Sequence, residues 1–128
     1  MSAWRRKALE LFPDLRNEIQ HGDTTIYGVF FELLPRCCQA HRQNDEEELR
    51  KIYDYAQWCF KSRSKDLWNA AGVAFYEHLG DHSETRKEMN KWVEPEIFES
   101  ISGLLEFMMG QKNFAELKKQ FPGKANDD

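Results

Sequence analysis

The sequence is poor in the residues that build cross-linked, zinc-bound or membrane-spanning proteins. Its three cysteines include an adjacent pair, Cys37 and Cys38, and no Cys-x-x-Cys pair, which favours reduced thiols over a disulfide framework or zinc site. No apolar run approaches the roughly 20 residues needed to span a bilayer. The basic N-terminus has only a short apolar stretch, interrupted by Glu10, and no signal-peptide core. We therefore expect a cytoplasmic protein.

Signals for catalysis and for β structure are also scarce. The chain has no Gly-rich phosphate loop and no Gly-x-Ser-x-Gly elbow. It has no Asn-Gly or Asp-Gly turn between alternating segments, which would indicate a β-hairpin. The net charge of −4 argues against a nucleic-acid-binding protein, because such proteins usually carry a basic face. We expect no enzymatic activity, no cofactor and neither a nucleic-acid nor a membrane partner.

Helical periodicity runs through nearly all of the 128 residues. Hydrophobic residues make up 41% of the chain and aromatic residues 13%, which is enough for a core without covalent cross-links. The short predicted connections favour an all-α fold, specifically a single-domain antiparallel bundle of five to seven helices over residues 1–121. Residues 122–128 are predicted to form a frayed tail.

Capping residues and prolines predict the helix boundaries in the first half of the chain. A helix should begin at Thr24 or Thr25, and Pro35 should kink or end it because proline lacks the amide donor. Asn44 or Asp45 should cap the next helix, whose first turn contains three glutamates favoured by the helix dipole.

The second half of the chain has similar signals. A helix over 65–79 is apolar nearly all round, which is typical of a central helix, and Gly80 should stop it. Ser83 is a possible cap for a short helix after that stop. Pro95 should open a further helix that ends at Gly110, because proline suits the first helical turn and glycine the C-terminus.

The stretch FYEHLGDH, residues 75–82, contains two histidines at helical spacing, His78 and His82. The zinc-peptidase pattern places a glutamate directly after its first histidine, whereas here Glu77 precedes His78. Gly80 lies between the histidines at an expected helix end, so they should not share a face. We interpret the stretch as helix packing followed by a loop, with no metal site.

The most promising surface lies on the helix that follows Asp45. Two large aromatic residues fall off its apolar stripe, where they either pack against another layer of the fold or anchor an interface. Acidic residues nearby would attract a partner with a basic surface. The residues predicted to bind this partner are Asp45, Glu46, Glu47, Asp54, Tyr55 and Trp58. Glu77 and Asp81 are the second choice.

Two segments carry a family resemblance: LFPDLRNEI at 11–19 and LWNAAGVAFYEHL at 67–79. Over residues 8–110 the chain resembles small bacterial helical proteins, some of which look like immunity proteins encoded beside secreted toxins. The positions that match the recurring helix of that family are Asn69, Val73, Phe75, Tyr76, Glu77, His78 and Leu79. The resemblance implies a cytoplasmic protein that binds and neutralises a toxin. The alternatives are a helical adaptor for another cellular protein and a metal-dependent enzyme centred on His78.

Overall fold

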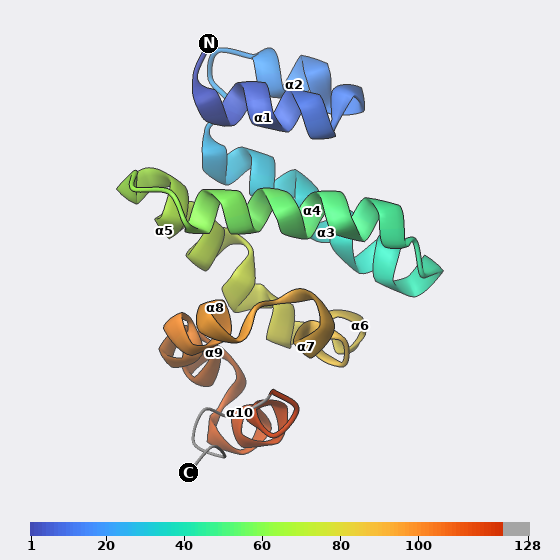
Figure 1. Cartoon of the computed structure of the whole chain (residues 1–128), viewed down its shortest axis with the longest axis vertical. Coiled ribbons are helices and arrows are strands. Elements are labelled where there is room, and N and C mark those ends of the chain that lie inside the picture. Colours follow the sequence, from blue (N-terminus) through green and yellow to red (C-terminus); the bar gives the residue numbers. More distant parts are fainter. Residues whose placement is uncertain (122–128) are drawn as a thin grey trace. The chain divides into compact units, whose positions relative to one another are not determined.

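The computed structural model describes residues 1–121, which form ten α-helices, two 3-10 helices and no strand (Figure 1). The predicted all-α class is confirmed. The α-helices outnumber the expected five to seven because several expected helices are divided into shorter ones. Among the described residues, no helix is both long and apolar enough to cross a membrane. The tail predicted for 122–128 lies outside the described residues.

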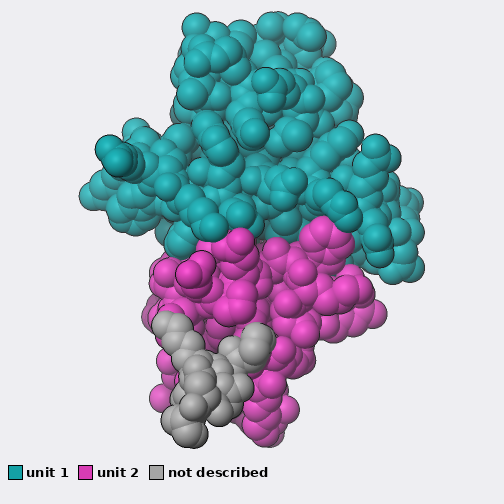
Figure 2. Space-filling view, in the orientation of Figure 1, with its two compact units in different colours: residues 1–75 teal, residues 76–128 magenta. Residues whose placement is uncertain are grey.

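The chain groups into two compact units, residues 1–75 and residues 76–128 (Figure 2). The prediction of one domain over residues 1–121 stays a prediction. The elements of unit 1 are α1 (Ala3–Leu11), η1 (Pro13–Leu15), α2 (Arg16–Gln20), α3 (Ile26–Gln43), α4 (Glu46–Phe60) and α5 (Lys65–Ala74).

Side-chain caps fix the start of the two longest helices. The Thr25 hydroxyl accepts a hydrogen bond from the Gly28 amide at the start of α3. The Asp45 carboxylate accepts one from the Glu48 amide at the start of α4. Between the two helices, Asn44 adopts a left-handed conformation with φ of 55°, which asparagine tolerates better than most residues. The tight turn makes α3 and α4 an antiparallel hairpin (Figure 1).

Pro35 does not end its helix, since α3 continues to Gln43, and the alternative of a kink at this residue stays a prediction. Proline at this position removes a hydrogen bond to the carbonyl of Phe31, four residues earlier. Pro35 and Phe31 are both exposed, so water can reach the carbonyl that loses its partner. Leu33 and Cys37 are fully buried on either side of the proline, and their packing holds the helix in place.

Aromatic rings dominate the core of unit 1. The Phe30 ring lies 5.6 Å from the Tyr55 ring and 5.7 Å from the Phe75 ring, measured between centroids. The Tyr55 ring also meets Phe12 edge-on at 6.1 Å, and Tyr53 meets Phe75 at 5.7 Å. These contacts join the residue between α1 and η1, the helices α3 and α4, and the residue after α5 in one continuous aromatic cluster.

Unit 2 consists of shorter elements. They are η2 (Tyr76–Asp81), α6 (Ser83–Arg86), α7 (Met89–Trp92), α8 (Pro95–Ser100), α9 (Ser102–Met109) and α10 (Gln111–Lys118). Its buried residues include Phe98, whose ring stacks on Phe114 at 5.8 Å and on Phe121 at 3.7 Å.

The boundaries of unit 2 partly follow the predictions. Pro95 occupies the first turn of α8, and α9 ends before Gly110, which has φ of 88° and ψ of 156°. The single helix expected between them is interrupted at Ile101, where ψ is 7°. Ser83 is the first residue of α6 and makes no capping hydrogen bond, because His82 occupies the cap position. The cap predicted at Ser83 is therefore wrong.

Candidate partner-binding surface

The exposed side of α4 carries most of the predicted contact residues. Glu46 and Glu47 are exposed in the first turn, where the helix dipole stabilises negative charge. Asp54 is exposed two turns further on, and Trp58 is half-buried one turn after Asp54. Because residues three and four apart are neighbours on a helix, these side chains share one broad face.

This face of α4 carries both signs of charge. Arg50 is exposed and lies one turn from both Glu46 and Asp54. Lys51 is half-buried beside Glu47, and Lys61 is exposed at the end of the helix. The acidic character predicted for the whole surface is therefore concentrated at its N-terminal end.

Tyr55 does not belong to the surface, and its prediction as a contact residue is wrong. Its side chain is fully buried, and its hydroxyl donates a 3.0 Å hydrogen bond to the carbonyl of Trp4. Burial raises the pKa of the Tyr55 phenol well above its ordinary value, so the group stays neutral. The core-packing alternative is correct for this residue, because α1 covers this part of α4.

Trp58 lies in a groove of about 560 Å³ formed by α1 and α4. Its ring stacks on Tyr55 with centroids 6.2 Å apart, and the Lys7 ammonium lies 6.0 Å from the ring centroid. Asp54 and Leu11 line the same groove. The structure thus brings Trp58 and Asp54 together, with one side of the indole held by the core and the other facing the groove.

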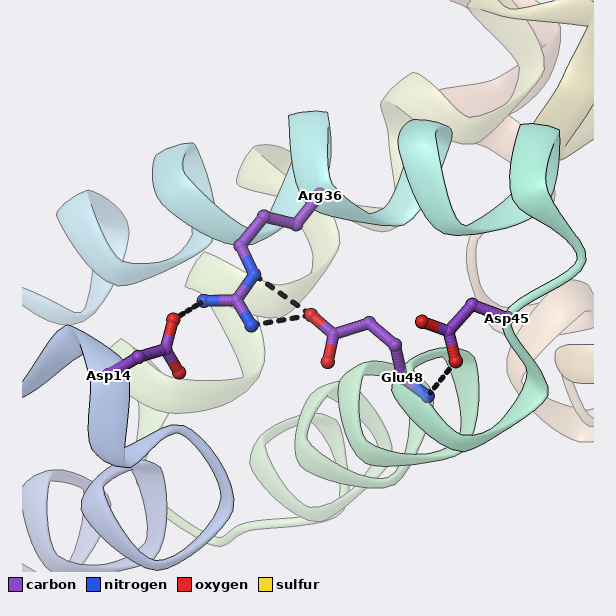
Figure 3. A network of polar contacts seen from close by, with 4 residues as sticks. All are labelled: Asp14, Arg36, Asp45 and Glu48. Carbon is purple, nitrogen blue, oxygen red and sulfur yellow. Dashed lines mark hydrogen bonds and ion pairs between the residues drawn. The ribbon is translucent and has the colours of Figure 1, made fainter.

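Arg36 makes an ion-pair network that the sequence did not reveal (Figure 3). Its Nη1 donates to Asp14 at 2.8 Å, and its Nε donates to Glu48 at 2.9 Å. The guanidinium also lies 5.4 Å from the centroid of the Phe12 ring. One α3 side chain therefore links η1 to the first turn of α4, close to the Asp45 cap. No local signal could have found these partners, which are 22 and 12 residues away in sequence.

Asp45 has a structural role that a binding test must separate from contact with a partner. Asp45→Ala removes the α4 cap and should lower the free energy of unfolding by about 1 kcal/mol. Asp45→Asn keeps an acceptor for the Glu48 amide and should cost less. Urea denaturation of both variants measures the difference. Equal losses for alanine and asparagine would show that the cap hydrogen bond contributes nothing.

The second choice of contact residues lies in the 3-10 helix η2. His78 Nδ1 lies 3.2 Å from Asp81, and His78 Nε2 lies 3.7 Å from Glu77. A 3-10 helix has three residues per turn, so residues three apart align and residues four apart do not. His78 therefore meets Asp81 instead of His82. Glu77 and Asp81 are both partly exposed, and their contact with a partner stays a prediction.

Neither a metal site nor activation of the Cys37 or Cys59 thiol emerges from the geometry of the described residues. Within residues 1–121, no group of three or more histidine, cysteine or acidic side chains is arranged to hold a metal ion. Burial raises the pKa of the Cys37 and Cys59 thiols to about 12, so both are protonated at neutral pH. His41 Nε2 lies 2.8 Å from the Tyr53 hydroxyl.

The sequence model of a family described as "Domain of unknown function (DUF7674)" matches residues 5–109. This range covers all of the candidate contact residues on α4 and in η2. No curated protein and no solved structure matches the chain significantly.

Proposed function

The chain belongs to this family of domains of unknown function, DUF7674, and we propose that it is an immunity protein. It binds a cognate bacterial toxin domain and occludes the active or substrate-binding surface of the toxin. The family description assigns no activity, so the proposal is supported by the resemblance of segments 11–19 and 67–79 and by the surface of unit 1.

The groove around Trp58 is the observation that carries the proposal. Binding energy at protein interfaces concentrates in a few residues, among which tryptophan is enriched, and these sit in well-packed pockets. Trp58 is already ordered by its contact with Tyr55, so little side-chain freedom is lost when a partner covers it. A stable interface of about 1,200–2,000 Å² centred here would extend over much of α4.

The acidic N-terminal end of α4 supplies the second part of the proposed interface. Glu46 and Trp58 are twelve residues apart, which is roughly 18 Å along a helix. A toxin that covers both would place its basic surface against Asp45, Glu46 and Glu47. Such charge complementarity mainly accelerates encounter and excludes wrong partners.

In the proposed function, the protein acts in the cytoplasm by binding the toxin, and it needs no cofactor, nucleic acid or membrane. A helical adaptor for another cellular protein would use the same kind of surface and is the second candidate. The two functions differ in the partner, so co-expression with the toxin-like product of a neighbouring gene separates them. Immunity predicts both rescue of growth and co-purification.

Trp58→Ala is expected to weaken toxin binding about tenfold or more, because it removes the ordered anchor from the groove. Isothermal titration calorimetry with a catalytically inactive toxin measures the change. Trp68→Ala is the matched control, since Trp68 is also a partly exposed tryptophan of unit 1 but lies on α5. Circular dichroism of both variants confirms that the helices remain.

Equal affinities of the two variants would remove the Trp58 groove from the interface. Loss of growth rescue by both folded variants would likewise contradict the assignment of the Trp58 groove to the toxin interface. If the neighbouring gene product neither binds nor is neutralised, the immunity proposal fails.

A further inference from the structure

A second groove of unit 1, of about 470 Å³, lies between α2 and α3. Its apolar lining includes Leu15, Ile19 and Val29, whose side chains are almost fully buried beneath it. Gly28 contributes no side chain, and a Cβ at this position would meet no atom closer than 3.8 Å. The groove is therefore an open slot with an apolar floor, and unit 1 has no segment filling it.

The rim of this groove is negatively charged. Glu18 from α2, Asp23 from the α2–α3 loop and Glu32 from α3 all line it and are all exposed. No lysine or arginine is among its lining residues. The nearby Arg5 is already engaged, because its guanidinium donates to the carbonyls of Ile19, His21 and Thr24. The groove thus presents three carboxylates around an apolar slot, in contrast to the mixed charges of α4.

We propose that this groove receives an arginine side chain from a protein partner. The arginine methylenes match the apolar floor, and the guanidinium offers five donors to the carboxylates at the rim. The guanidinium presents its donors in a planar fork that matches carboxylate geometry, whereas an ammonium acts as a point charge, which favours arginine over lysine. The identity of the partner rests on the proposed function, in which the arginine belongs to the toxin.

The test uses three short peptides with the whole chain. The first is acetyl-Gly-Arg-Gly-amide, and in the other two peptides citrulline or lysine replaces the arginine. Citrulline keeps the shape of arginine but lacks its charge. Titration is followed by the amide resonances of the ¹⁵N-labelled protein. We expect saturable shifts at Thr24, Thr25, Gly28 and Val29 with the arginine peptide, and roughly tenfold weaker binding of the citrulline peptide.

The charge requirement is tested with Glu18→Gln/Glu32→Gln. This variant should weaken arginine-peptide binding at least about fivefold, because it removes two of the three rim carboxylates. Glu10→Gln/Glu116→Gln changes the net charge equally at exposed sites outside the groove and should bind the peptide like the unmodified chain. The spectra of the free variants report whether the fold is retained.

In the titration, the inference would be overturned by the absence of saturable shifts at millimolar peptide or by shifts confined to other residues. Equal binding of the arginine and citrulline peptides would also overturn it. So would equal weakening of arginine-peptide binding by the two double glutamine variants. Equal binding of the lysine peptide would overturn the choice of arginine. Peptide binding in the groove without neutralisation of the toxin would leave the groove assignment standing and remove the immunity function. Neutralisation of the toxin without peptide binding would leave the immunity function standing and remove the groove assignment.

Discussion

Tyr55→Ala should lower the free energy of unfolding by about 3–5 kcal/mol, the range found when a large buried aromatic side chain is truncated. The Tyr55 ring is fully buried and contacts the rings of Phe12, Phe30 and Trp58. Its removal leaves a cavity where η1, α3 and α4 meet. Urea denaturation followed by circular dichroism measures the loss.

Tyr55→Phe is the matched control for this prediction. It keeps the ring and removes only the hydrogen bond to the Trp4 carbonyl, which should cost about 0.5–1.5 kcal/mol. Alanine and phenylalanine variants of equal stability would contradict the role assigned to the ring. Because Tyr55→Ala disturbs the fold, a binding test of the α4 surface must vary Trp58 alone.

Gly80→Ala should lower the free energy of unfolding by about 1–3 kcal/mol, as is typical when extra volume is forced into a packed site. Gly80 is buried in η2, and a Cβ there would lie 2.5 Å from Met109 Sδ and 2.9 Å from Met109 Cγ. These atoms belong to the middle of the Met109 side chain, so the side chain must move as a whole. Urea denaturation measures the cost.

Met109→Ala should partly rescue Gly80→Ala, since it removes the atoms that clash with the new methyl group. In a double-mutant cycle, the double variant should be more stable than the sum of the single effects predicts. Gly103→Ala is the control for adding a methyl group to a helical glycine, because a Cβ at Gly103 meets nothing within 4 Å. Strict additivity of the two changes would contradict a contact between Gly80 and Met109.

Local chemistry made several features predictable. Thr25, Asp45 and Pro95 mark helix starts through hydrogen bonds or backbone geometry that involve residues within one turn. Gly110 marks a helix end because its positive φ is costly for residues with a Cβ. The helical period similarly predicted the all-α class, since it depends only on neighbouring residues.

Features that depend on distant residues were not predictable from the pattern. Tyr55 lies off the apolar stripe of α4, yet α1 covers it, and the hydrogen bond joins residues 51 apart in sequence. Trp58, three residues later, stays partly exposed. The Arg36 network and the acidic groove both require the packing of α3 against earlier segments. The helix expected over 65–79 ends at Ala74 and is followed by the 3-10 helix η2, a change that the apolar pattern did not indicate.

The boundary between the two compact units falls between adjacent residues, Phe75 and Tyr76, and both side chains are almost completely buried. The Phe75 ring belongs to the aromatic cluster of unit 1, while Tyr76 begins η2. The chain therefore has no spacer at which a gene could be divided into interchangeable modules. A fragment cut at this peptide bond would end or begin on a bulky aromatic that has lost its neighbour in sequence.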